Sequence, residues 1–256
     1  MRPIQVNKPK PFGQELRDYL AFVRQPSLAP RLPAARHGSG WVADWLTPLP
    51  WGRMLQWAGF LWALNIFVLG PIALAAALAG GAEHRLDLSN IPWFHALVWA
   101  PVVEELVFRF GLRQPRAAVL VFPVAVVAML LGPGGLQAAL LIAVLWFCWR
   151  PSYRARGKPL NTLPWPARRL WQRHFGLIVH LSCLAFAAVH LHNFMLNEMP
   201  IWLMPLLVLP QWLTGLVLAW LRVRRGIGAA ICLHAMFNAG PLLVVLLIIG
   251  LTGGVK

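Results

Sequence analysis

Residues 100–111 read APVVEELVFRFG and place two adjacent carboxylates and an arginine inside one of the most apolar parts of the chain. Charged side chains at membrane depth are costly, and they face a protein interior or a water-filled cavity. Glu104, Glu105 and Arg109 therefore predict a membrane helix that turns a polar face toward other helices. Glu105 and Arg109 lie four residues apart and can pair, while Glu104 projects about 100° to one side.

The composition around this stretch is that of an integral membrane protein. Of the 256 residues, 59% are hydrophobic and only 12% are charged, and the mean hydropathy is +0.62. A soluble protein carries about a quarter of its residues as Asp, Glu, Lys and Arg. In a soluble chain the net charge of +15 would suggest nucleic acid. Here its distribution indicates membrane topology instead, and we expect no nucleic-acid partner.

Apolar runs predict an all-α, polytopic membrane bundle of about seven transmembrane helices. A span needs about 20 mostly apolar residues. The segment Gly132-Pro-Gly-Gly135 divides one long run into a tight hairpin, because glycine and proline end helices. The predicted spans are 56–80, 90–112, 113–131, 135–151, 173–194, 200–221 and 227–250.

Lys and Arg residues gather on alternate connections between these spans. Twenty of them lie in 1–53, 113–116, 150–173 and 222–225. The other connections hold only Arg85 and Lys256. Basic loops stay on the cytoplasmic side of a membrane and contact anionic headgroups. We therefore predict a cytoplasmic N-terminus and an external C-terminus, in the inner membrane if the protein is bacterial.

The charge and composition divide the chain into two parts. Residues 1–53 form a basic segment rich in Pro, Arg and Trp, which we expect to be cytoplasmic and partly interfacial. Residues 54–256 form the transmembrane domain. Tryptophan favours the membrane–water interface. The tryptophans that suggest such a position are Trp41, Trp45, Trp51 and Trp57.

Two further spans carry imidazole and amide side chains at helical spacing. Phe186 and His190 lie four residues apart on the fifth predicted span, and His234 and Asn238 do so on the seventh. Residues four apart share a helix face. Taken singly, such groups more often hydrogen-bond between membrane helices than take part in catalysis. Their occurrence beside an acidic pair favours a shared site.

These groups are the set needed to activate water, provided that the three helices converge. A desolvated Glu104 near His190 can take a proton from a water held between them. His234 and Asn238 can donate hydrogen bonds to a developing oxyanion. The neighbouring glutamate–arginine pair can hold the first carboxylate in place. Peptide hydrolysis requires these roles.

The motifs EExxxR at 104–109, FxxxH at 186–190 and HxxxN at 234–238 occur in this order on separate spans. In this ordered triplet the chain resembles the CPBP family, which includes CAAX prenyl endopeptidases and bacteriocin-processing intramembrane proteases. The resemblance covers roughly residues 90–250. Against the family pattern, the hairpin and basic loop at 113–173 look inserted.

The resemblance implies a role for each matching side chain. Glu104 would be the base that activates water, and His190 would share that water. The implied oxyanion donors are His234 and Asn238, the residues orienting the carboxylate are Glu105 and Arg109, and the substrate pocket includes Phe108 and Phe186. No cofactor is favoured. Zinc held by Glu104, His190 and His234 is the alternative, although the sequence lacks an HExxH-like pair.

The leading functional hypothesis is an endopeptidase that cleaves near the C-terminus of a membrane-associated peptide or protein, prenylated or not. We expect its site to open toward the basic, cytoplasmic face. One alternative is a non-proteolytic scaffold or immunity protein of the same family. A less favoured alternative is a proton-coupled transporter, which would predict inverted repeats that the sequence does not show.

Overall fold

The computed structural model describes residues 11–28, 44–46, 48–85, 91–149 and 163–251. Its α-helices are α1 (Phe12–Arg24), α3 (Trp51–Leu64), α4 (Gly70–Gly80), α5 (Ala100–Phe108), α6 (Phe110–Arg113), α7 (Pro115–Leu131), α8 (Gly135–Trp149), α9 (Trp165–Arg173), α10 (Phe175–Val189), α11 (Met204–Leu207), α12 (Leu209–Arg225) and α13 (Ile227–Leu251). The helical turns between them are the π turns η2 (Asn65–Leu69) and η3 (His95–Trp99) and the 3-10 turns η5 (His190–Asn193) and η6 (Ile201–Leu203). Two short strands, β1 (Glu83–His84) and β2 (Phe194–Met195), pair antiparallel.

Long apolar helices make the fold that of an all-α membrane protein, as predicted. Within the described residues, three helices are long and apolar enough to cross a membrane, namely Trp51–Gly80, Phe175–Asn193 and Ile227–Val244. The bent pair Ile201–Leu207 and Leu209–Arg225, with 49° between its halves, makes a fourth if it counts as one span. Helices α7 and α8 are apolar but shorter. The predicted number of seven spans is therefore not confirmed.

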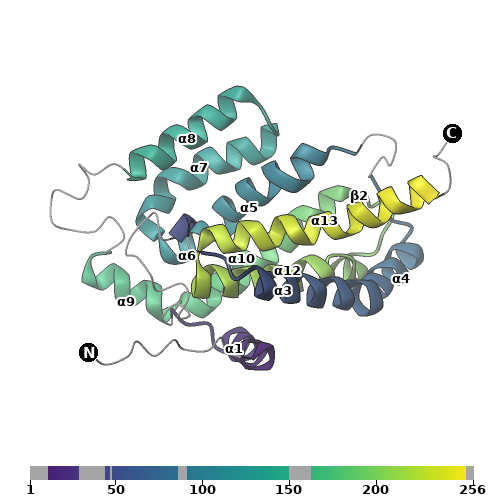
Figure 1. The fold of residues 1–256 in the computed structure, drawn as a ribbon, viewed down its shortest axis with the longest axis horizontal. Coiled ribbons are helices and arrows are strands. Elements are labelled where there is room, and N and C mark those ends of the chain that lie inside the picture. Colours follow the sequence, from purple (N-terminus) through teal and green to yellow (C-terminus); the bar gives the residue numbers. More distant parts are fainter. Residues whose placement is uncertain (1–10, 29–43, 47, 86–90, 150–162, 252–256) are drawn as a thin grey trace.

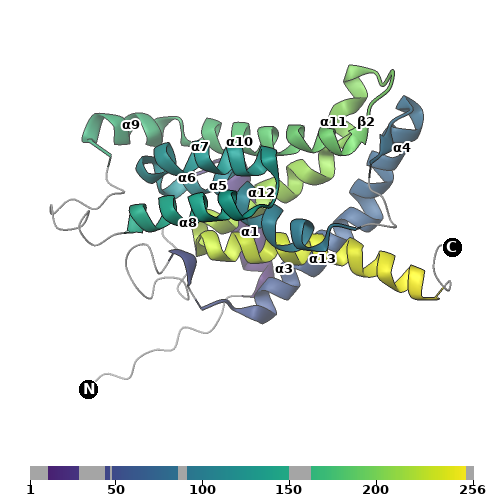
Figure 2. The same cartoon turned by 90° about the horizontal axis from the view of Figure 1, so that it is seen from above.

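The helices pack into a bundle with two distinct ends. Helix α13 contacts α3, α5 and α12, while α7 and α8 form a hairpin beside α5. In the view of Figure 1 this hairpin lies along one edge and α1 along the opposite edge. Both views place α6 and α9 at one end of the bundle and α4 and β2 at the other (Figures 1 and 2). We call the first the basic end, because it carries Arg113, Arg173 and 222–225, and the second the strand end.

The turn between α7 and α8 is where the sequence predicted it. Helix α7 ends at Leu131, and Gly132 adopts φ 76° and ψ −171°. Only glycine adopts this backbone conformation without strain, because its positive φ is unfavourable for residues that carry a Cβ. The predicted span at 90–112 is divided instead, because the chain leaves helical geometry at Arg109 with φ −125° and ψ −23°.

Helix α13 continues past a proline because another helix supplies the missing donor. Pro241 has no N–H, so Phe237 O four residues earlier loses its helical partner. The indole Nε1–H of Trp62 donates to Phe237 O over 3.1 Å. At Gly240 an added Cβ would overlap the same indole, so glycine permits this close approach. The predicted span 227–250 is therefore one continuous helix, with Pro241 inside it.

Helix α1 is attached to the basic end of the bundle by a buried carboxylate. Glu15 is 4% exposed, and its Oε1 lies 2.6 Å from Arg225 NH2. Its Oε2 accepts a hydrogen bond from Trp57 Nε1 at 3.3 Å. Trp57 is fully buried within the protein, and the interfacial position of this segment stays a prediction. Trp51 is largely exposed, and Trp41 lies outside the described residues.

A second buried ion pair connects Asp44 to the same end. Asp44 Oδ1 lies 2.6 Å from Arg222 NH1, and both side chains are at most 1% exposed. The remaining donors of Arg222 reach two backbone carbonyls, Arg109 O and Phe110 O, each at 3.1 Å. A Cβ on Gly226, where φ is +111°, would lie 2.6 Å from Asp44 O. Asp44 therefore holds Arg222 in place, and Arg222 in turn binds the backbone carbonyls at the break between α5 and α6.

Replacing Asp44 should test the strength of this support. Asp44→Asn leaves the buried Arg222 charge without a counterion, and such a loss costs about 3 kcal/mol or more of folding free energy. The matched control is Asp18→Asn, since Asp18 pairs with Arg224 at 2.7 Å but is 35% exposed. Because solvent reaches Asp18, we expect a smaller loss for this pair, on the order of 1 kcal/mol. Thermal unfolding in detergent measures both, and equal shifts for the two variants would contradict the proposed support.

Candidate active site

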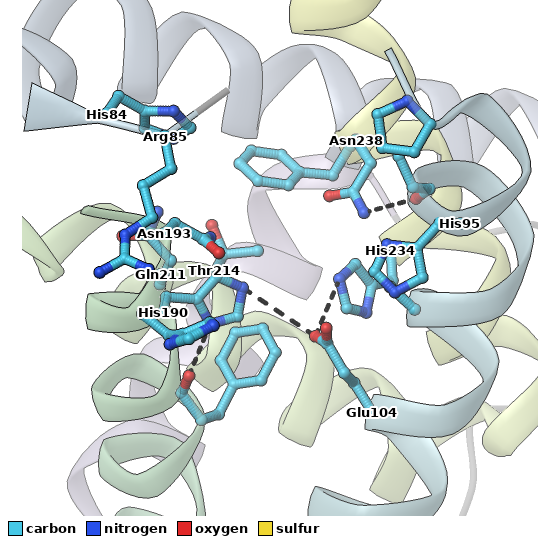
Figure 3. Close-up of a pocket in the computed structure, with 16 residues that line it drawn as sticks. His84, Arg85, His95, Glu104, His190, Asn193, Gln211, Thr214, His234 and Asn238 are labelled. Carbon is cyan, nitrogen blue, oxygen red and sulfur yellow. Dashed lines mark hydrogen bonds and ion pairs between the residues drawn. The ribbon is translucent and has the colours of Figure 1, made fainter. Parts of the chain in front are cut away.

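The three motifs meet around one cavity of about 500 Å³ (Figure 3). Helix α5 contributes Glu104, the end of α10 contributes Phe186 and His190, and α13 contributes His234 and Asn238. Five of the eight histidines of the chain line this space. The convergence that the sequence required is thus present. The cavity concentrates most of the imidazoles of the protein in one place.

Glu104 lies between two imidazoles without touching either closely. Its Oε2 is 4.0 Å from His190 Nε2 and 3.7 Å from His234 Nε2. Both separations exceed the usual hydrogen-bond distance of about 3.2 Å. Within the described part of the chain this buried oxygen has no hydrogen-bond partner. A polar contact across such a gap suits a bridging water.

His190 is oriented by the helix end from which it projects. Helix α10 ends at Val189, and the backbone N–H of His190 bonds to Ala187 O, which leaves Phe186 O available. The ring Nδ1 of His190 lies 2.7 Å from Phe186 O. A carbonyl only accepts, so Nδ1 carries the proton and Nε2 faces Glu104. The four-residue spacing of FxxxH is therefore the spacing of a helix-end hydrogen bond.

The second carboxylate is fully buried behind the first. Glu105 is 0% exposed, and its Oε1 lies 2.8 Å from Arg109 NH1 and 3.1 Å from His234 Nδ1. The predicted pairing of Glu105 with Arg109 is confirmed. The Arg109 guanidinium also lies 3.7 Å from the centre of the Phe186 ring. Glu105 accepts from Nδ1 of His234 and so turns Nε2 of that ring toward Glu104.

Asn238 is held by a carbonyl that a proline leaves without a donor. In the π turn η3 the N–H of Ala100 bonds to His95 O. Continuing that pattern, Ala96 O would need the N–H of Pro101, which proline lacks. Asn238 Nδ2 donates to Ala96 O over 2.9 Å instead. One amide hydrogen of Asn238 is thus used, and the second remains for another acceptor.

Helix α12 contributes two residues that the sequence analysis missed. Gln211 and Thr214 both line the cavity, on the side of His190 in Figure 3. Thr214 is 1% exposed. Neither Thr214 Oγ1 nor Gln211 Oε1 has a hydrogen-bond partner among the described residues. Their three-residue spacing inside a predicted span was the available signal, because residues three apart share a helix face.

Of the two aromatic residues expected in the pocket, only Phe186 lines the cavity. Phe108 lines a separate apolar groove of about 670 Å³ between α5, α7 and α10. Its ring contacts Phe186 with the centroids 5.5 Å apart. Because Phe108 projects to the other side of Phe186, the expectation that it borders the same pocket is wrong.

The mouth of the cavity lies at the strand end, so the expected opening toward the basic end is also wrong. His84 and Arg85 line the cavity from β1 and the residue after it, and His192 and Asn193 line it from η5. Arg85 Nε donates to Phe194 O at 3.1 Å, which ties the mouth to β2. Partial desolvation lowers the pKa of His84. Of these two neighbouring residues, Arg85 rather than His84 therefore carries the positive charge near neutral pH.

For the described part of the chain, zinc stays the alternative that the sequence left open. No group of three or more His, Cys, Asp or Glu side chains there is placed to hold a metal ion. The three zinc ligands suggested by sequence, Glu104, His190 and His234, do line one cavity but do not form such a group. We derive no chemical step through a metal.

Comparison with known families gives one match. The family described as type II CAAX prenyl endopeptidase Rce1-like matches residues 88–240, which is more than half of the chain. No curated protein and no solved structure matches the chain. The matched region contains all three motifs.

The two glutamates should differ in what they contribute to stability. Glu105→Gln removes the counterion of buried Arg109, and we expect a loss of about 3 kcal/mol or more of folding free energy. Glu104→Gln replaces a carboxylate whose buried oxygen has no partner, so we expect unchanged or increased stability. The melting temperatures of both variants and of wild type, measured in detergent, test this difference. A large loss for Glu104→Gln would mean that Glu104 is a structural residue.

Proposed function

The chain belongs to the type II CAAX prenyl endopeptidase Rce1-like family of CPBP proteins, and from this we propose that it is an intramembrane endopeptidase. The proposed substrate is a membrane-associated peptide or protein, prenylated or not, cleaved near its C-terminus. The protein acts through a water activated by glutamate and histidine. Its proposed partners are this substrate and anionic headgroups, without nucleic acid.

One observation carries the catalytic part of the proposal. The Glu104 carboxylate faces the Nε2 atoms of His190 and His234 across 4.0 and 3.7 Å, and all three side chains line a cavity of about 500 Å³. A carboxylate with an unsatisfied oxygen beside an imidazole nitrogen is suited to hold and deprotonate a water. The support of this arrangement by Glu105 and Arg109 explains why a second carboxylate lies beside the first.

The proposed hydrolysis balances with the residues of this chain. Glu104 takes one proton as the water oxygen bonds to the carbonyl carbon of the substrate. The oxyanion accepts from the second amide hydrogen of Asn238, and from His234 Nε2 when that ring is protonated. When the C–N bond breaks, the proton on Glu104 passes to the departing nitrogen. The products are a carboxylic acid and an amine.

The proposed membrane topology follows the distribution of basic residues. The protein crosses the membrane several times, with a cytoplasmic N-terminus and an external C-terminus. In that orientation the cavity mouth at the strand end lies on the non-cytoplasmic side. A substrate presented by the cytoplasm would require the opposite orientation. Labelling from one side of the membrane decides between the two.

Activity should depend on Glu104 and on no added metal. With quenched farnesylated and unmodified C-terminal peptides, Glu104→Gln should lower kcat by at least about 100-fold, as expected for loss of a general base. The matched control Glu198→Gln changes an exposed acidic residue that does not line the cavity and should leave cleavage unchanged. Wild-type cleavage should survive strong chelation. Equal cleavage by Glu104→Gln would refute the assigned base, and no cleavage of any peptide by wild type would favour a binding role.

Cysteine labelling should report which side of the membrane holds the cavity mouth. In a variant without Cys148, Cys183 and Cys232, we expect Arg85→Cys to react with a membrane-impermeant maleimide on intact cells. The matched control Arg168→Cys lies on exposed α9 and should react only after permeabilisation. The reverse pattern would show that the mouth faces the cytoplasm and that the proposed orientation is inverted.

A further inference from the structure

The wall of the cavity formed by α12 has polar atoms that the catalytic scheme does not use. Thr214 Oγ1 and Gln211 Oε1 are buried and have no partner in the described segments, although both residues line the cavity. Leaving a buried polar atom unsatisfied costs about 1–3 kcal/mol. Such a cost is expected where a ligand supplies the missing hydrogen bond.

The chemistry of these atoms indicates what the ligand must offer. The amide oxygen of Gln211 only accepts, and the hydroxyl of Thr214 can accept as well as donate. On the other side of Glu104, His234 turns Nε2 toward the carboxylate, and the amide nitrogen of Asn238 donates to Ala96 O and keeps a second hydrogen (Figure 3). One wall of the cavity is therefore suited to an N–H group and the facing wall to a carbonyl oxygen.

A trans peptide unit has this distribution of donors and acceptors. Its C=O and N–H point in opposite directions from one planar group. We infer that the cavity binds the scissile peptide unit crosswise, with its carbonyl oxygen toward Asn238 and its N–H donating to Thr214 Oγ1. Gln211, one turn nearer the mouth, accepts a second N–H from the departing segment. This inference rests on the proposed function and assigns substrate-binding residues outside the three motifs.

The position of Thr214 is fixed by close packing at the next residue. A Cβ on Gly215 would lie 3.1 Å from both Arg109 NH2 and Phe186 Cδ1. Helix α12 thus rests directly against the guanidinium that supports Glu105 and the ring beside His190. This contact places Thr214 relative to Arg109 and Phe186, which pack beside Glu105 and His190. The nitrogen that receives the proton in the last step lies on the α12 side.

The test compares amide and ester versions of one substrate. Thr214→Val removes the hydroxyl, and Thr214→Ser keeps it. For the amide substrate, Thr214→Val should lower kcat/KM about tenfold, the effect of losing one hydrogen bond, while Thr214→Ser stays near wild type. In the depsipeptide an ester oxygen replaces the scissile N–H, so nothing donates to Thr214. With this substrate, kcat/KM of Thr214→Val should be about equal to that of wild type, because the substrate no longer donates a hydrogen bond that the variant could lose.

Stability provides the second measurement. Because Thr214 Oγ1 has no partner before substrate binds, Thr214→Val should leave the Tm unchanged or raise it. An equal loss of kcat/KM on amide and ester, or no loss on the amide, would overturn the inference while the proposed hydrolysis stands. A lowered Tm would show a structural hydroxyl and would also overturn it. If wild type cleaves neither substrate, or Glu104→Gln cleaves both, the proposed function fails and the inference fails with it.

Discussion

The site depends on one fully buried carboxylate. Glu105 bonds at the same time to Arg109, the residue just after its own helix, and to His234 on α13, so it joins two of the three helices that hold the reactive groups. A buried ion pair contributes little net stability by itself, yet removing one member leaves an uncompensated charge. The Glu105–Arg109 pair therefore acts mainly to fix the position of α5 relative to α13. Glu104 can remain without a partner because its neighbour carries the structural role.

Proline residues in the membrane helices explain why several polar side chains occupy their positions. Pro101 leaves Ala96 O without a donor and Pro241 leaves Phe237 O without one, and Asn238 and Trp62 satisfy these carbonyls. In a bilayer the alternative to such a bond is an exposed backbone group, which costs several kcal/mol by the order of magnitude for buried polar groups. The side-chain amide of Asn238 thus satisfies a backbone carbonyl of another helix and also borders the cavity.

The sequence predicted the helical class, the turn at Gly132 and the meeting of three motifs, because each depends on local pattern or on the cost of burying charge. It did not predict which way the cavity opens, since that depends on how α10 ends and on where the paired strands β1 and β2 place the residues of the mouth. Phe108 was misplaced because motif spacing does not report which side of Phe186 a ring occupies. Gln211 and Thr214 were missed because neither is charged and the flanking residues are apolar.

The part of the chain that precedes the family match is built into the site it surrounds. Asp44 neutralises Arg222 beneath the break at Arg109, Trp62 completes α13 below Asn238, and His84 borders the mouth. The residues that match the family model and the residues that precede them therefore build one site together. If residues 88–240 were exchanged for those of a relative, the reactive groups would therefore lie next to Asp44, Trp62 and His84, which pack against the side chains of this chain.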